Sequence, residues 1–433
     1  TAIGYKTLAA QTGTSGEVGN TAVGYQAGQF ITTGTHSTFI GNQAGQGIGG
    51  TKLTGTHNTC VGSESGLLLQ GAANNNTIVG ALAGDAITTG DGNTIMGKSA
   101  GSAAADVDDL VIIGRGAGAS ALTSDADGAV FIGADAGSSN TAGQYNLAVG
   151  YSALAVNVTG DGNTAVGYGT LSAAVSPNND GNNTAVGASA AAYVGTGTGN
   201  TAVGANAMLG DYSTGSGTND IDGNNNTAIG SSAGLVMITT AHSNTFVGAT
   251  AGDVATTAVE NTCLGFNADI QDATATNQVV IGNNITGTKD NAVFIGNDSS
   301  HIENDFNADA TWNHSSDMRQ KTNIQDDTLG LNFVNNLRTV TYTHKSPSEF
   351  PQEWTAYDPE DTTPMGGGKT IHGFIAQEVK EALDSTGCET FGGWSVDPDG
   401  RQRVSFEAFV MPLIRAVQEL SAKVEELEGR LEE

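Results

Sequence analysis

A short pattern, Asn-Thr-Ala-Val-Gly in its commonest form, recurs from the first residue to about position 300. Most neighbouring copies are 17 to 21 residues apart, with one interval of 26 and a last interval of 14. This period predicts an array of short stacked units rather than one globular core. The closing glycine stands at seventeen positions: Gly4, Gly24, Gly41, Gly62, Gly80, Gly97, Gly114, Gly133, Gly150, Gly167, Gly187, Gly204, Gly230, Gly248, Gly265, Gly282 and Gly296.

Two apolar residues come directly before each of these glycines. Neighbouring strand residues point to opposite faces of a sheet, so a strand that is apolar at both positions is expected to be buried on both faces. One coil of a parallel β-roll has a single interior, and its other apolar face therefore needs a cover. We expect further copies of the chain to provide that cover, with Phe39, Phe131 and Phe294 on the covered outer side.

The positions around the strand also repeat. A Gly-x-x-Ala-Gly turn follows the strand in several copies, and a variable loop rich in Thr, Gly, Asp and Asn leads to the next strand. Such loops either build a binding surface or tolerate surface variation. We expect the asparagine four residues before the glycine to form a hydrogen-bonded ladder between coils. It occurs as Asn20, Asn58, Asn76, Asn93, Asn146, Asn163, Asn183, Asn200, Asn226, Asn244 and Asn261.

Composition divides the chain near residue 300. Residues 1–300 hold 5 of the 16 Lys and Arg residues and none of the three Trp residues. The formal net charge of −29 repels phosphate backbones and anionic lipid, which argues against nucleic-acid binding, and no apolar run is long enough for membrane insertion. Thr1 lies inside a repeat, so we expect further residues upstream. Cys60 and Cys263 fit buried apolar positions rather than a disulfide.

Several motif matches in the repeats are products of repetition. Residues 92–99 fit the phosphate-loop pattern, and residues 97–101 and 230–234 fit a nucleophile elbow, but each is the repeat itself. Asp-Gly-Asn turns such as residues 91–93 lack the period of about nine residues of calcium-binding β-rolls. An EF-hand at Asp397 and Asp399 fails because Phe406 occupies its twelfth position. We expect no metal and no cofactor.

The last third of the chain predicts a small α+β domain. An apolar pattern within residues 316–337 predicts one helix, and residues 339–344 alternate like a strand. Residues 345–369 read as a Pro- and Gly-rich loop, residues 373–378 lead into a helix that ends near Leu383, and residues 394–406 read as a hairpin.

A heptad pattern closes the chain and predicts a coiled coil. Val and Leu at alternate core positions favour two strands in isolated peptides. The rest of the assembly is expected to set the number, and we expect three. The heptad residues are Val410, Leu413, Val417, Leu420, Val424, Leu427 and Leu431.

One motif suggests chemistry: residues 315–324, Ser-Ser-Asp-Met-Arg-Gln-Lys-Thr-Asn-Ile. Taken alone, Ser316 and Lys321 are most simply a helix cap and a solvated lysine. The order Ser-Asp-x-Arg-x-Lys-x-Asn-Ile, then Gly-Phe-Ile-Ala-Gln-Glu, then a coiled coil resembles the intramolecular chaperone domain of endosialidase-type phage tail spikes, the S74 peptidase family.

That resemblance implies a domain that trimerises, promotes folding of an upstream β-rod and then cuts itself off. It implies Ser316 as the nucleophile, Lys321 as the general base and Ser315–Ser316 as the cleaved bond. His314 is adjacent to this site, and we interpret it as a bystander. Any enzyme activity would be at most a single-turnover autoproteolysis. The repeats resemble the left-handed parallel β-roll in the head domains of trimeric autotransporter adhesins, with longer units and irregular loops.

These observations predict a mainly β protein with a trimeric β-roll shaft at residues 1–300, a linker and cleavage junction at 301–315, an α+β chaperone domain at 316–407 and a trimeric coiled coil at 408–433. The favoured function is a phage tail fibre or spike in the virion tail, assembled in the host cytoplasm. Its partners would be two further copies, a host-surface receptor or glycan, and other tail proteins through the upstream region. The alternatives are a bacterial surface adhesin and, ranked last, a polysaccharide-degrading spike, which needs paired carboxylates in a groove.

Overall fold

The structure is a computed structural model, described here for residues 1–12, 18–173, 181–210, 221–238, 240–306, 316–354 and 356–432. The chain divides into two compact units, Thr1–Ser315 and Ser316–Glu433. Each unit is described by itself.

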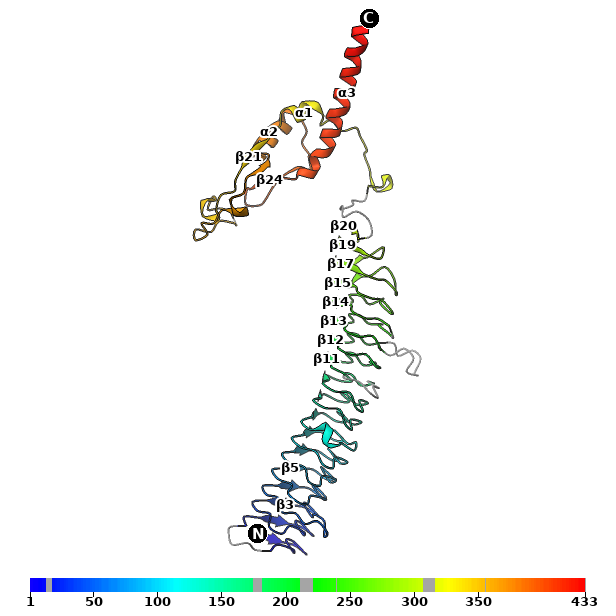
Figure 1. The fold of residues 1–433 in the computed structure, drawn as a ribbon, viewed down its shortest axis with the longest axis vertical. Helices are drawn as coiled ribbons and strands as arrows, with labels where there is room; N and C mark the ends of the chain where they lie inside the picture. The colour runs from blue at the N-terminus through cyan, green and yellow to red at the C-terminus, as the bar shows by residue number, and fades with distance from the viewer. Residues whose placement is uncertain are drawn as a thin grey trace. The chain divides into compact units, whose positions relative to one another are not determined.

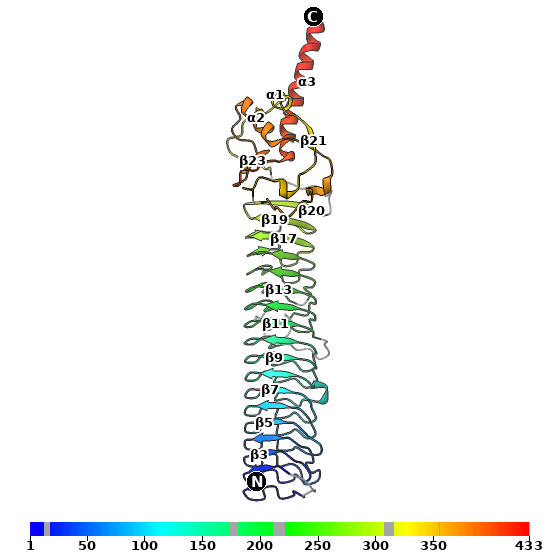
Figure 2. The ribbon, with the colours of Figure 1, turned by 90° about the vertical axis from the view of Figure 1, so that its left-hand side faces the viewer.

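The first unit is a parallel β-solenoid in which each repeat contributes one short strand to a common sheet (Figure 1). Figure 2 shows these strands stacked one above another along one side of the solenoid. The expected mainly β class is confirmed. The strands are β1 (Ala2–Ile3), β2 (Thr21–Val23), β3 (Thr38–Ile40), β4 (Thr59–Val61), β5 (Thr77–Val79), β6 (Thr94–Met96), β7 (Val111–Ile113), β8 (Val130–Ile132), β9 (Leu147–Val149), β10 (Thr164–Val166), β11 (Thr184–Val186), β12 (Thr201–Val203), β13 (Thr227–Ile229), β14 (Thr245–Val247), β15 (Thr262–Leu264), β17 (Gln278–Asn283), β19 (Ala292–Asn297) and β20 (Ser300–Asp305).

The interior of each coil is filled by the second residue before the glycine. Strands pair in register one repeat apart, so that Ala22 lies beside Phe39 and Phe39 beside Cys60. Phe39, Phe131 and Phe294 are fully buried within the solenoid. The expectation that they lie on the outer side was wrong, because the alternation of side chains along the strand turns this position inward and the next one outward.

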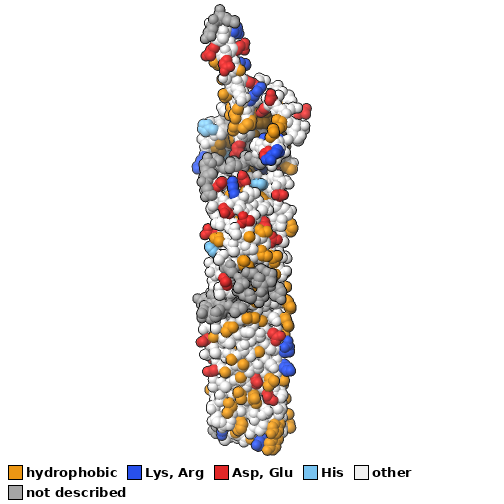
Figure 3. Space-filling model, turned by 90° about the vertical axis from the view of Figure 1, so that its right-hand side faces the viewer, with side chains coloured by type: hydrophobic (Ala, Val, Ile, Leu, Met, Phe, Trp, Pro, Cys, Tyr) orange, Lys and Arg blue, Asp and Glu red, His pale blue; other side chains and the backbone are white. Residues whose placement is uncertain are grey.

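The outward position, directly before the glycine, forms a row that we call the outer column. All its members are aliphatic or Met, and in β2 to β15 each is at least partly exposed in the single chain. On the opposite, loop-bearing face of the solenoid, uncharged polar side chains and backbone predominate (Figure 3). The most exposed members of the outer column are Ile3, Ile40, Met96, Val186, Ile229 and Leu264.

The predicted asparagine ladder is confirmed. Asn76 donates from Nδ2 to Oδ1 of Asn58 at 3.0 Å, and Asn93 donates to Asn76 at 2.9 Å. Each amide also bonds the backbone of a neighbouring coil, as Asn76 does with the carbonyl of Gly90 at 2.8 Å. These side chains are buried, so the ladder satisfies polar groups that would otherwise destabilise the interior.

The repeated glycine is required by close backbone approach. Gly24 has φ +137°, and a Cβ atom at this position would lie 2.2 Å from the carbonyl oxygen of Gly41. Any side chain would collide with the next coil, and the same geometry recurs along the solenoid.

The solenoid changes its pattern at its C-terminal end. β17 and β19 are six residues long, and a separate pair of short strands, β16 (Ala268–Asp269) and β18 (Ile285–Thr286), lies beside them. β20 then pairs antiparallel with β19. Residues 301–305, which the sequence analysis assigned to the linker, therefore belong to the solenoid sheet.

The second unit is a small α+β structure around one apolar cluster, which includes Leu329, Phe333, Val379, Leu383 and Phe409. Its elements are α1 (Leu331–Asn335), β21 (Val340–Tyr342), β22 (Ile371–Gly373), α2 (Ala376–Thr386), β23 (Trp394–Val396), β24 (Gln402–Val404) and α3 (Val410–Glu432). The predicted strand at 339–344, the second helix and the hairpin are confirmed. The helix predicted within residues 316–337 is α1, which is only five residues long and begins directly after Gly330.

α3 is the predicted C-terminal helix. Its heptad residues are exposed in the single chain, from 46% at Val424 to 86% at Leu431. The coiled coil itself stays a prediction. Within the described residues, none of the helices combines the length and the apolar character needed to span a membrane.

Candidate functional site

The structure brings Ser316 and Lys321 together. Lys321 Nζ donates a hydrogen bond to Ser316 Oγ at 2.6 Å. His314 and Ser315 lie outside the described residues. The geometry is the one that proton transfer between a serine hydroxyl and a lysine amine requires.

A tight turn between the two residues creates this contact. Residues Met318–Gln320 form one 3₁₀ turn, and the backbone N–H of Lys321 donates to the carbonyl of Met318 at 3.1 Å. Asp317 precedes the turn and accepts the N–H of Arg319 at 2.8 Å. The Arg319 guanidinium also binds this carboxylate, with Nη2 2.6 Å from Oδ2. These hydrogen bonds hold the pKa of Asp317 below its usual value.

The site is fully open in the single chain. Residues 316–328 are all exposed, and burial begins only at Leu329. A lysine is a general base only when its amine is neutral, and burial away from water favours the neutral form. The single chain therefore supplies the contact between the two groups but not the dry surroundings that the chemistry needs.

The segment after the site is fixed to α3. The backbone N–H of Leu331 donates to Glu419 Oε2 at 2.9 Å, and Arg415 Nε donates to Glu419 Oε1 at 3.2 Å. A Cβ atom at Gly330 would lie 2.4 Å from Glu419 Oε1, so a larger residue at this position would have to displace the Glu419 carboxylate. The heptad helix thus holds the start of α1 through one carboxylate.

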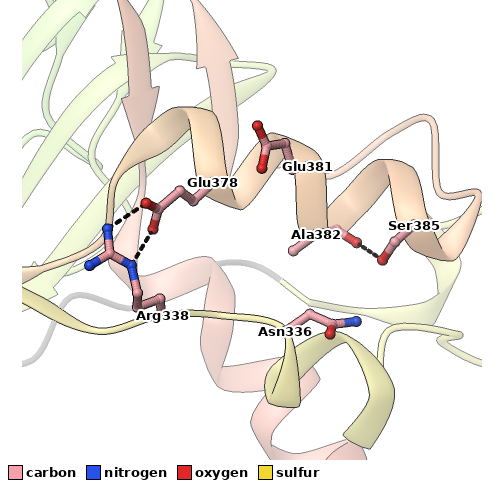
Figure 4. A pocket seen from close by; sticks show the side chains of 6 residues that line it. All are labelled: Asn336, Arg338, Glu378, Glu381, Ala382 and Ser385. Carbon is pink, nitrogen blue, oxygen red and sulfur yellow. Dashed lines mark hydrogen bonds and ion pairs between the residues drawn. The ribbon is translucent and has the colours of Figure 1, made fainter.

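A polar groove lies between α2 and the segment that follows α1 (Figure 4). Arg338 Nε donates to Glu378 Oε2 at 3.0 Å, and the guanidinium and carboxylate form a two-point ion pair. This pairing lowers the pKa of Glu378. The other lining residues are Asn336, Glu381, Ala382 and Ser385. The Arg338–Glu378 pair connects α2 to the segment before β21, and the hydroxyl of Ser385 donates to the carbonyl of Ala382.

A carboxylate pair in the solenoid, Asp253 and Asp269, is not evident from the sequence pattern. Asp269, at the end of β16, is 8% exposed and interacts with Asp253. Burial and the nearby Asp253 carboxylate raise the pKa of Asp269 to about 7. Glycoside hydrolysis needs two carboxylates that face a substrate groove. Asp269 is buried, so it offers no such site.

The rejected motifs fall on solenoid coils. β6 lies inside residues 92–99, where a phosphate loop would have to precede a helix, and residues 230–234 form the turn after β13. Across the part of the chain that is described, the His, Cys, Asp and Glu side chains form no group of three or more that could hold a metal ion.

Comparison with known proteins gives one match. Residues 316–388 match the family model of the chaperone of endosialidase, peptidase S74. The match covers about one sixth of the chain and begins at Ser316, where the second compact unit begins. No curated protein and no solved structure matches the chain.

Proposed function

We propose that the chain is the distal part of a phage tail fibre or tail spike, in which a trimeric shaft is followed by an intramolecular chaperone that releases itself. The observation that carries this proposal is the family match over residues 316–388, directly after a long parallel β-solenoid. The match supports a C-terminal chaperone, and the solenoid is the kind of upstream rod on which such a domain acts.

A parallel solenoid has a physical need for a chaperone. Its parallel strands pair with partners 14 to 26 residues away, and every coil must form in the correct register. Until they pair, strand edges remain open to wrong partners. Non-local pairing of this kind is slow to form, so a domain that gathers and aligns the chains would shorten the search.

Two exposed apolar surfaces support a homotrimer. Along the solenoid, the outer column leaves aliphatic side chains partly uncovered, among them Ile40 at 41% and Leu264 at 47%. On α3, the heptad row is exposed over the length of the helix. Contiguous apolar surface of this extent is typical of interaction sites. Three copies that share both surfaces would cover them.

The Ser316–Lys321 contact supports self-cleavage. Ser316 Oγ would attack the carbonyl carbon of residue 315 while its proton passes to Lys321 Nζ. The peptide nitrogen of Ser316 would leave with a proton, and water would then hydrolyse the resulting ester to a free carboxylate. Both residues are exposed in the single chain, so cleavage would be controlled by assembly. Assembly would bury Lys321 and favour its neutral amine. Cleavage would then follow correct folding.

In this function the protein belongs to the virion tail and is assembled in the host cytoplasm. The loops between solenoid strands would meet a receptor or glycan on the host surface, and the region upstream of Thr1 would bind other tail proteins. The variable length of these loops on a constant frame supports this assignment.

Mass spectrometry of the full chain tests the proposal. We expect a fragment that starts at Ser316 in the parent, and intact chains in Ser316→Ala and Lys321→Ala. Lys369→Ala changes another exposed lysine and should cleave like the parent. Sedimentation of all four proteins should show trimers before cleavage. Intact parent chains would refute self-cleavage, and monomeric chains would refute the trimeric fibre.

A further inference from the structure

The last strand of the solenoid breaks the pattern of the repeat. β20 runs antiparallel to β19 and pairs with it along six residues, from Ala292 opposite Asp305 to Asn297 opposite Ser300. The neighbouring strands before it pair in parallel, as β17 does with β19. Asn297 shapes the reversal, because its Oδ1 accepts the backbone N–H groups of Ser299 and Ser300 at 3.0 and 2.9 Å.

The register of this pair changes the chemistry of the solenoid interior. Directly opposite residues of an antiparallel pair lie on the same face of the sheet. Phe294 is fully buried in the core and faces Glu303 across the pair, and the buried Ala292 faces Asp305. The interior row, filled by apolar side chains in the coils below, therefore ends in two acidic residues.

The charges of this terminal layer are paired with one another. Lys289 Nζ lies 3.8 Å from Glu303 Oε1 and 3.6 Å from Asp305 Oδ2. His301 Nε2 lies 3.8 Å from Glu303 Oε2, and the His301 ring packs edge-on against Phe294 with 6.0 Å between ring centroids. A polar layer with a mixed charge thus covers the last aromatic side chain of the core.

The outer face continues without such a change. Ile302 of β20 lies beside Ile295, so it extends the outer column by one more aliphatic residue. It is 37% exposed in the single chain. β20 therefore places Glu303 and Asp305 on the face that closes the interior, and it places the aliphatic Ile302 in the outer column.

We propose that β20 and Lys289 form a capping layer that closes the solenoid core and prevents shafts from associating end to end. The last coil of a stack leaves one strand edge unpaired and its apolar interior uncovered, and repeat proteins need a polar terminal unit to stay soluble. Charged side chains that point inward on a terminal strand are one of the devices that block further strand pairing.

The capping layer precedes the predicted cleavage site in the chain. Asp305 precedes the Ser315–Ser316 bond, so the capping layer stays with the solenoid whether or not the second unit is removed. The closed core end consequently does not depend on the second unit, and this inference does not require self-cleavage.

Electron microscopy of cut shafts tests the inference. The full chain would carry a recognition sequence for a site-specific protease in place of residues 307–314, and would be cut after folding. Glu303→Val combined with Asp305→Ala continues the apolar interior row through β20. The control is Asp106→Ala combined with Asp125→Ala. It also removes two negative charges, but from exposed positions on the side of the solenoid.

We expect cut parent and control shafts to remain single rods. The Glu303→Val, Asp305→Ala shafts should form rods of twice the length, joined at their C-terminal ends, in at least tenfold higher proportion. Residue 303 lies opposite Phe294. If the double variant does not fold, the single variant Glu303→Leu should form the same double-length rods, in a smaller proportion. Double-length rods in the parent, or single rods in folded variants of both kinds, would overturn the inference.

Discussion

The carboxylate of Glu419 accepts a hydrogen bond from the backbone N–H of Leu331, a residue 88 positions earlier in the chain. This hydrogen bond connects the heptad helix α3 to the first turn of α1. It also fixes the end of the exposed segment that carries Ser316 and Lys321. A displacement of α3 would therefore act on the position of that segment, in part through Glu419.

Removal of this contact should loosen the start of α1. Glu419→Ala leaves the N–H of Leu331 without its partner, which should destabilise the second unit by about 1–3 kcal/mol. Glu419→Gln keeps an acceptor and should lose less. Hydrogen exchange of the Leu331 amide should accelerate in Glu419→Ala, while Glu426→Ala, at an exposed position of α3, should leave it unchanged. Equal exchange in all proteins would show that Glu419 does not hold α1.

A second prediction concerns the repeated glycine. Gly97 has φ +137°, and a Cβ atom there would lie 2.5 Å from the carbonyl oxygen of Gly114. Gly97→Ala should therefore strain the backbone and separate two coils, at a cost of at least about 1–3 kcal/mol. Gly50→Ala is the matched control, because a Cβ atom at Gly50 meets nothing within 4 Å. Thermal unfolding should show a lower midpoint for Gly97→Ala only, and equal midpoints would contradict the packing argument.

A third prediction tests the outer column. Met96→Asp combined with Ile229→Asp places two charges on side chains that are 46% and 40% exposed in the single chain. If copies of the chain cover this column, burial of unpaired carboxylates should prevent assembly of the shaft. Sedimentation should then show a smaller particle. Ala105→Asp, at an exposed loop position, should assemble normally, and normal assembly of both would show that the column is not an interface.

Much of the solenoid could be predicted from the sequence because its constraints are local and repeated. The glycine and the two apolar residues before it recur in every repeat, and the asparagine recurs in most of them, each at a fixed place relative to the strand. The pattern did not show which of the two apolar side chains points into the coil and which points outward. Both Phe39 and Ile40 are apolar, and only the geometry of the coil shows that Phe39 fills the interior while Ile40 faces outward.

The candidate site also contains residues that the sequence could predict and residues that only the structure identifies. The spacing of Ser316 and Lys321, together with the family resemblance, singled out two residues that the structure places 2.6 Å apart. Glu419 carried no such signal, because it is one of several glutamates on a heptad helix and its partner lies in a different element. The pair of Asp253 and Asp269 was missed because contacts between coils depend on loop lengths that vary from repeat to repeat.

That buried pair leads to a prediction on pH. Burial raises the pKa of Asp269 from its usual 3.8 to about 7, so the folded solenoid retains a proton that the unfolded chain has already lost. Stability that comes from this group is present below about pH 4 and is lost as the pH rises to about 7. The midpoint of thermal unfolding of the parent should therefore fall across this window relative to Asp269→Asn, whose neutral amide does not titrate.

The difference should be on the order of 2 kcal/mol, because Asp253 shares the proton and part of the effect. Asp298→Asn, which changes an exposed aspartate near the same end of the solenoid, corrects for the general loss of one charge. Its unfolding midpoint should follow that of the parent at every pH. If Asp269→Asn also follows the parent, the carboxylate does not hold its proton in the folded protein, and the pair would instead be ionised and separated by water.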